Sequence, residues 1–186
     1  TQEQFSRSQE FLRDISEAFG LEINGLTRQF TQFYVSAKDK LSANEIEGIF
    51  TSISKAGAVL GLSVDNQNRA FLALNQMMSK GTVQAEELRG QLGEALPGAF
   101  GIMAKAVGVT EKELQNMMKA GEVLADEVLP KFAKELEKVY GIENINRVET
   151  LAAAQNRLSN EWTEFIRSLD EGSGVISNFF KTIISE

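Results

Sequence analysis

The sequence contains neither cysteine nor histidine among its 186 residues. Without cysteine the chain can form no disulfide framework and no thiolate metal site. Without histidine it lacks the side chain that most often acts as a general base and as a transition-metal ligand. We therefore expect this chain to need no cofactor and no metal, and to have no enzymatic activity.

Basic charge and long apolar runs are also scarce. The chain carries 19 basic against 26 acidic residues, which gives a net charge of −7. An acidic chain lacks the electrostatic attraction behind most non-specific nucleic-acid binding. The longest apolar run, residues 95–104, is interrupted by Pro97 and two glycines, whereas a membrane span needs about 20 apolar residues. We expect no direct nucleic-acid binding and no membrane span in this segment.

Only two prolines occur, and apolar residues recur at helical spacing almost throughout. Ser42 with Glu45, and Thr110 with Glu113, form capping boxes that open helices. The pattern predicts helices that end near residues 20, 37, 60, 80, 96, 107, 121 and 140. The fold class is therefore all-α: a compact multi-helix domain of short, glycine-punctuated helical hairpins, followed by a longer C-terminal amphipathic helix.

The C-terminal region, residues 142–186, combines a long amphipathic helix with a tail. The helix carries Leu151, Leu158, Trp162, Phe165, Ile166 and Leu169. We expect a break at Gly172-Ser173-Gly174, and then a last helix with an apolar stripe of Ile176, Phe179, Phe180 and Ile183. The sequence leaves open whether that stripe packs internally or is exposed. Because the chain begins at Thr1 without methionine, we expect a piece of a longer protein or a processed terminus.

A pattern of apolar residues, glycine and acidic residues occurs twice. Each copy reads as a helix end, a glycine reversal and an acidic first turn, which suits the positive end of a helix dipole. We therefore expect residues 61–141 to form two related helical hairpins that pack against each other. Residues 1–60 should form helices that precede them. We expect all these regions to belong to a single structural domain. The first copy is Leu74, Met77, Met78, Gly81, Val83, Ala85, Glu86, Glu87 and Leu88, and the second is Leu114, Met117, Met118, Gly121, Val123, Ala125, Asp126, Glu127 and Val128.

Two glycines in the helix expected at residues 85–96 need an explanation. Gly90 and Gly93 each cost about 1 kcal/mol relative to alanine inside a helix. Their presence indicates that the helix backbone approaches another element closely. That element is the neighbouring hairpin or a partner protein.

The segment around these glycines resembles the signature of the tape measure domain, found in the tail tape measure proteins of phages and prophages. The similarity spans roughly residues 72–132 and continues through the Gly108-Val109-Thr110 turn to Leu129-Pro130-Lys131-Phe132. The flanking regions are consistent with the family without being diagnostic. The residues that carry the similarity most closely are Ser79, Lys80, Gly81, Glu86, Glu87, Leu88, Arg89, Gly90, Gln91, Leu92, Gly93, Pro97 and Gly98.

The resemblance implies a structural virion component. Tape measure proteins are long and largely helical, the tail tube polymerises around them, and their length fixes the length of the tail. The implied partners are other tail proteins (tail tube, tip or assembly chaperones) or further copies of the chain. The implied location is the cytoplasm during assembly and then the interior of the virion tail. A chain punctuated so often by glycines should be a compact module at one end of the ruler, with long glycine-poor helices after Glu186.

Two other interpretations compete with this one. The first is a helical adaptor or interaction module recruited to another bacterial protein, which differs only in the sequence after Glu186. The second is an enzyme such as a cell-wall hydrolase. Such an enzyme usually needs a zinc site with histidines or a carboxylate pair in a cleft. The sequence offers no histidine and no convincing pair, because Glu86 and Glu87 are adjacent and point to different helix faces.

Overall fold

The computed structural model describes the chain over residues 2–173, with side chains described for residues 6–168. The all-α prediction is confirmed, because the described part contains helices and one isolated β-bridge but no strand. In chain order the elements are α1 (Gln2–Phe19), α2 (Ile23–Ala37), α3 (Ala43–Val59), α4 (Val64–Lys80), the π-helical η1 (Glu86–Leu92), α5 (Gly93–Ala95), α6 (Ala99–Val107), α7 (Glu111–Ala120), α8 (Ala125–Tyr140) and α9 (Leu151–Ser173).

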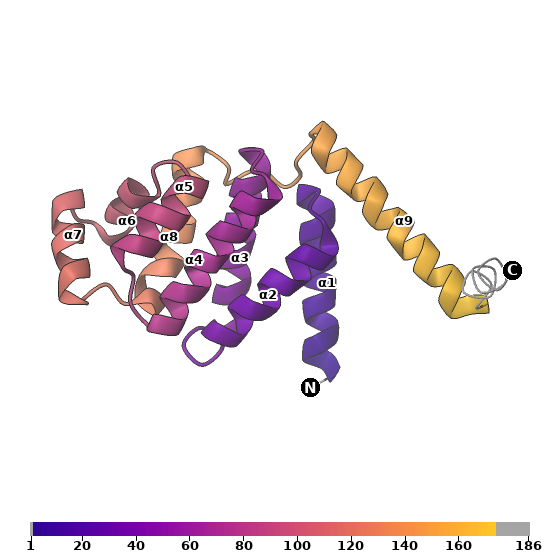
Figure 1. The fold of residues 1–186 in the computed structure, drawn as a ribbon, viewed down its shortest axis with the longest axis horizontal. Helices are drawn as coiled ribbons and strands as arrows, with labels where there is room; N and C mark the ends of the chain where they lie inside the picture. Colours follow the sequence, from indigo (N-terminus) through magenta and orange to yellow (C-terminus); the bar gives the residue numbers. More distant parts are fainter. Residues whose placement is uncertain (1, 174–186) are drawn as a thin grey trace, which may run out of the picture.

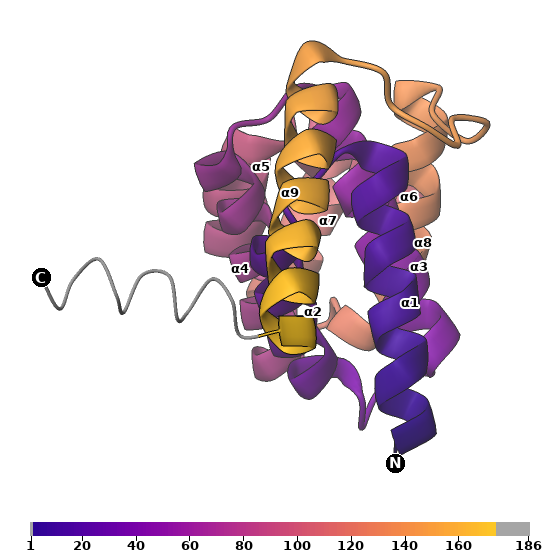
Figure 2. The same ribbon diagram turned by 90° about the vertical axis from the view of Figure 1, so that its right-hand side faces the viewer.

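Helices α1 to α8 form one bundle, and α9 lies at its edge. Figure 1 shows α7 at one end of the long axis and α9 at the other, with α1 to α4 and α8 between them. Within the bundle, α8 packs against α3 and α6, and α4 packs against α2 and η1. Figure 2, viewed from the α9 end, shows that no other labelled element lies in front of α9.

The bundle is held by one continuous cluster of buried apolar side chains that runs from Leu12 to Val148. Its best-packed part is a chain of rings. Phe30 meets Phe50 edge-on with ring centroids 5.1 Å apart, and Phe50 stacks on Phe71 at 4.5 Å. These rings join α2, α3 and α4. Each fully buried side chain of this kind contributes roughly 1.5–3 kcal/mol to folding.

Both predicted capping boxes are present and fix the starts of α3 and α7. Ser42 Oγ accepts a hydrogen bond from the Glu45 backbone N–H at 3.3 Å, and the Glu45 carboxylate accepts one from the Ser42 N–H at 2.9 Å. Thr110 and Glu113 repeat the arrangement at 3.2 and 2.8 Å. The hydrogen bonds from Ser42 lower the pKa of Glu45, and those from Thr110 lower the pKa of Glu113.

The segment expected as a regular helix over residues 85–96 has a different geometry. It is π-helical over Glu86–Leu92, continues as the short α5, and stops where Leu96 becomes extended before Pro97. The stop agrees with the effect of proline on the preceding residue. The expected close approach of a neighbouring hairpin is wrong at Gly90, because a Cβ added there would meet no atom within 4 Å.

The glycine at position 93 is explained by a contact within its own helix, which the sequence did not indicate. A Cβ added there would lie 3.1 Å from the Leu88 carbonyl oxygen, five residues earlier. The wider turn of a π-helix brings that carbonyl next to the Gly93 backbone. The glycine therefore accommodates the helix's own geometry rather than another hairpin.

The predicted break at Gly172-Ser173-Gly174 is wrong in its first two residues, since α9 continues through Ser173. An isolated glycine lowers helix stability by only about 1 kcal/mol, so a long helix tolerates one near its end. Gly174 and the predicted last helix with Ile176, Phe179, Phe180 and Ile183 lie outside the described residues.

The two copies of the repeated pattern meet at their turns. Gly81 and Gly121 both adopt the left-handed conformation, at φ +79° and +71°. The Val83 N–H donates to the Val123 carbonyl at 2.8 Å, and the Ala125 N–H donates to the Gly81 carbonyl at 3.0 Å. The two reversals therefore satisfy each other's backbone groups across a small antiparallel bridge.

Candidate interaction site

The signature residues form a buried corner of the bundle with an exposed rim, and not a single cleft. Ser79 and Lys80 end α4, and Gly81 caps it. Leu88 and Leu92 are completely buried, whereas Glu86, Arg89 and Glu94 are exposed. The buried members of the signature thus build the core, and the exposed members are available for contact.

An ion pair with a buried carboxylate and a partly exposed lysine fixes the start of η1. Lys80 Nζ donates to Glu87 Oε1, and Glu87 is only 1% exposed. The hydrogen bond with Glu87 raises the pKa of Lys80. We expected Glu86 and Glu87 only to complement the helix dipole. Glu87 also holds α4 to η1, because a buried carboxylate needs a cation beside it.

The exposed rim is ordered by two contacts. The Arg89 guanidinium lies 3.8 Å from the centre of the Phe100 ring, a cation–π contact between η1 and α6. The Tyr140 hydroxyl donates to the Pro97 carbonyl at 2.7 Å and ties α8 to the loop after α5. Partial burial raises the pKa of Tyr140. Arg89 and Phe100 border a shallow hollow with Gly93, Gly98 and Glu111.

The second surface is the contact of α9 with α1 and α2, and it is mainly polar. Arg157 is buried, and its guanidinium donates to the carbonyls of Glu17 at 2.7 Å and Val148 at 2.6 Å. Asn160 Nδ2 donates to the Leu21 carbonyl at 2.8 Å and to Ser16 Oγ at 2.9 Å. The Glu17 carbonyl at the end of α1 and the Leu21 carbonyl, which also accepts from Ser16 Oγ, thus tie α9 to the α1–α2 corner.

One glycine makes this contact possible. Gly20 follows α1 with φ +63°, and a Cβ built on it would come closer to the Ala153 Cβ than real Cβ atoms approach one another. The first turn of α9 therefore rests directly on a backbone without a side chain. The Asn156 amide donates to the Gly20 carbonyl at 2.8 Å in the same contact.

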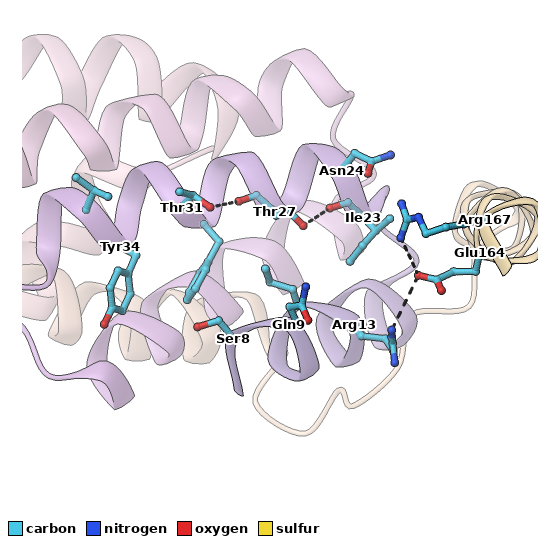
Figure 3. Close-up of a pocket in the computed structure, with 13 residues that line it drawn as sticks. Ser8, Gln9, Arg13, Ile23, Asn24, Thr27, Thr31, Tyr34, Glu164 and Arg167 are labelled. Atoms are coloured by element: carbon cyan, nitrogen blue, oxygen red, sulfur yellow. Dashed lines mark hydrogen bonds and ion pairs between the residues drawn. The ribbon is translucent and has the colours of Figure 1, made fainter. Parts of the chain in front are cut away.

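A groove of about 530 Å³ lies between α1 and α2 and is bordered by the far part of α9. Figure 3 shows Thr27 and Thr31 along one wall, and Glu164 between Arg13 and Arg167 at the α9 end. Glu164 Oε1 is 4.0 Å from Arg13 Nη2 and 3.7 Å from Arg167 Nη1. The lining residues thus supply hydroxyl and amide groups, and their one carboxylate is shared by two arginines.

The apolar side chains of α9 lie on the side away from the bundle. Leu151, Leu158, Trp162 and Phe165 are 77, 69, 63 and 50% exposed. The Trp162 and Phe165 rings contact each other with centroids 5.6 Å apart. Exposed apolar side chains grouped in this way make this side of α9 a candidate contact surface.

Neither a membrane span nor a metal centre accompanies these surfaces in the described part of the chain. Among residues 2–173, no helix is both long and apolar enough to cross a bilayer. The described side chains also contain no group of three or more acidic, cysteine or histidine residues placed to hold a metal ion. The fold defines the class of the described part: an all-helical domain with a polar contact at α9 and exposed apolar side chains on the other side of that helix.

The chain belongs to the tape measure protein family, whose model matches residues 1–171. It is 30% identical over 174 residues to a probable tape measure protein of Salmonella phage Felix O1 (isolate Felix O1-VT1). The aligned region covers 90% of this chain and 24% of that protein. It is 29% identical over 99 residues to a probable tape measure protein of Lactococcus phage c2, covering 50% of this chain and 14% of the relative. No solved structure matches the chain significantly.

The family resemblance expected from the signature is thus confirmed, and this chain spans about a quarter of the first relative's length. Sequence reasoning missed the polar contact of α9 and the groove beside it. Arg157 and Asn160 recur at helical spacing on the side of α9 opposite to its exposed apolar residues, but this spacing alone does not say which side lies on the bundle. No local signal could indicate the groove, because it depends on α9 meeting α1 and α2, which lie far earlier in the sequence.

Proposed function

We propose that this chain is a folded module of a phage tail tape measure protein that takes part in tail assembly and in setting tail length. The observation that carries the proposal is the family match over residues 1–171, in a chain that spans only 24% of the first relative. A helix advances about 1.5 Å per residue, so a long helical chain is a natural ruler.

This module differs from a ruler in its geometry. Its helices are punctuated by glycines in the left-handed conformation, including Gly61, Gly81, Gly108, Gly121 and Gly141, and they fold back on one another into one bundle. The module therefore serves as the folded part of the protein, and the measuring length lies elsewhere in the parent chain. Its role is contact and not catalysis.

The proposed partners are other tail proteins, namely the tube, the tip or assembly chaperones, together with further copies of this chain. The exposed rim of the signature, including Arg89 and Phe100, and the exposed face of α9 are the surfaces for these contacts. The protein acts in the cytoplasm while the tail assembles and afterwards lies in the interior of the virion tail. No direct contact with nucleic acid is required of this module, whose chain has a net charge of −7.

The test is tail length measured by electron microscopy. In-frame deletions are made in helical sequence of the parent gene outside residues 1–186. Tails that shorten in proportion to the residues removed support the proposal that the length of the parent protein sets the length of the tail and that this domain is its folded module. Tails of unchanged length contradict the proposal and favour the alternative, a helical adaptor recruited to another protein.

A further inference from the structure

The groove between α1 and α2 has apolar side chains from both helices in its wall. Leu12 and Phe30 belong to the core cluster, Tyr34 packs against that cluster, and Val35 is 62% exposed. Its volume of about 530 Å³ is in the range of clefts that bury a bound group. Apolar surface that leaves water contributes to stability in proportion to its area. An apolar occupant of this groove therefore stabilises the module.

The two threonines of the groove place no demand on such an occupant. The Thr27 hydroxyl donates to the Ile23 carbonyl at 2.7 Å, and the Thr31 hydroxyl donates to the Thr27 carbonyl at 2.8 Å (Figure 3). Both hydroxyl protons are thus already bonded within α2. Covering a polar group is costly only when its hydrogen bond is lost, so an apolar element can lie along this wall.

We propose that the groove holds residues 174–186 of this same chain, which turn back after α9 and run along it as the second arm of a helical hairpin. The segment has the apolar spacing of one helix face and only two charged residues, Lys181 and Glu186. Gly174 follows the end of α9, and glycine at that position permits the left-handed reversal that ends many helices. The apolar stripe comprises Ile176, Phe179, Phe180 and Ile183.

The length of the segment matches the position of the groove. Glu164 and Arg167 of α9 line the groove, and α9 ends at Ser173. Because a helix advances about 1.5 Å per residue, Glu164 lies about 13 Å and Arg167 about 9 Å before the end of α9. A return helix over residues 175–186 is about 18 Å long. It passes both residues and brings Phe180 level with Arg167.

The covalent connection favours this occupant over a separate chain. A short flexible link gives a tethered segment an effective concentration in the millimolar range. The segment is joined to α9, whose Glu164 and Arg167 form part of the groove, so it competes there with partners at much lower concentration. Helix α9 is then fixed at its start by the contact with Gly20 and further along by the hairpin, while Trp162 stays exposed.

The first test uses the absence of native cysteine. Thr31→Cys, at an exposed position of the groove, is combined with Phe180→Cys and oxidised mildly at low protein concentration. We expect a disulfide within one chain in high yield, detected by the mass of the intact protein and of its peptides. The matched control combines Phe165→Cys with Phe180→Cys and should give little disulfide. Phe165 is 50% exposed and does not line the groove, yet an undocked tail reaches it more easily than Thr31.

Equal yields for the two pairs, or a higher yield for the control, overturn the proposal. A disulfide that links two chains instead of one also overturns it, because a second copy then fills the groove. Neither result involves tail length, so the proposed function stands or falls separately.

The second test is thermal unfolding of the full chain. Phe179→Asp with Phe180→Asp should lower the melting temperature by roughly 5–10 °C, because the groove loses two buried rings. Ser177→Asp with Thr182→Asp adds the same charge at polar positions off the apolar stripe and should change the melting temperature by about 1–2 °C at most. Equal melting temperatures for the two variants overturn the proposal.

Discussion

The bundle and α9 are both helical, yet they place their apolar side chains on opposite sides. In the bundle, Phe30, Phe50 and Phe71 lie inside. In α9, Arg157 is buried while Trp162 is exposed. A bundle helix is held mainly by apolar burial, which is not directional. The contact of α9 is held by directed hydrogen bonds, which fix an orientation and leave the apolar side chains of Leu158, Trp162 and Phe165 exposed.

The largest effect should come from removing an aromatic side chain of the bundle. Phe50→Ala leaves a cavity between two other rings, and we expect it to lower the free energy of unfolding by about 3–5 kcal/mol. The matched change in α9, Phe165→Ala, should cost less than about 0.5 kcal/mol in the monomer, because the ring is half exposed. Urea denaturation of both variants at low concentration measures the difference. Equal losses would contradict the comparison.

The next largest effect should come from Arg157, whose removal leaves the Glu17 and Val148 carbonyls without their donor. We expect Arg157→Met to weaken the attachment of α9 by about 1.5–3 kcal/mol, the usual range for hydrogen bonds to a charged group. Hydrogen exchange followed by mass spectrometry should show faster exchange in α9 and near residue 148, with unchanged protection in α3. Arg167→Met, at an exposed position in the same helix, should leave α9 as it was. Unchanged exchange in Arg157→Met would show that apolar contacts hold α9.

A comparison of Gly20 with Gly61 separates the steric cost of crowding α9 from the cost of a left-handed backbone. Gly20 and Gly61 have nearly the same φ, +63° and +64°, but only Gly20 faces another element, at Ala153. Gly61→Ala should cost about 1–2 kcal/mol, the strain of the left-handed conformation alone. Gly20→Ala should cost about 1–3 kcal/mol more, because the added methyl must displace α9. Thermal unfolding of the two variants gives the difference, and equal costs would mean that α9 does not rest on Gly20.

The smallest effect concerns the contribution of two helix caps of the bundle to the pH dependence of stability. The pKa values of Glu45 and Glu113 are lowered from 4.5 by their capping hydrogen bonds. A carboxylate with a depressed folded-state pKa stabilises the fold above its unfolded value, and this contribution is lost as the pH falls through the folded value. The melting temperature should therefore fall on acidification below about pH 4.5. Glu45→Gln with Glu113→Gln should flatten this dependence. A slope identical to that of the original chain would exclude the caps as its source.

The sequence predicted the local structure well because the relevant signals are local. Ser42 with Glu45, and the glycine at 81, fix helix ends through contacts within a few residues. The π-helical turn of η1 was not predictable, since the preference for it over a regular helix depends on how Leu88 and Leu92 reach the core. At the signature, the sequence identified the family but gave Glu87 only a role at the helix dipole, because its burial and its pairing with Lys80 depend on packing.

The orientation of α9 was not predictable for a more general physical reason. An apolar stripe usually indicates an inward-facing helix, and nothing in the pattern distinguishes a partner's core from the chain's own. The distinction depends on Gly20 and the carbonyls at the α1–α2 corner, which lie far away in the sequence. The groove of Figure 3 depends on the same long-range contact.

Trp162 is the only tryptophan of the chain, so its fluorescence shows directly whether α9 is attached by its polar face. The emission and its quenching by acrylamide are recorded in dilute solution. We expect solvent-exposed, readily quenched emission, because the Trp162 side chain is 63% exposed. Emission at short wavelength that resists quenching even at high dilution would contradict this arrangement, because it would mean that the apolar face of α9 packs on its own bundle.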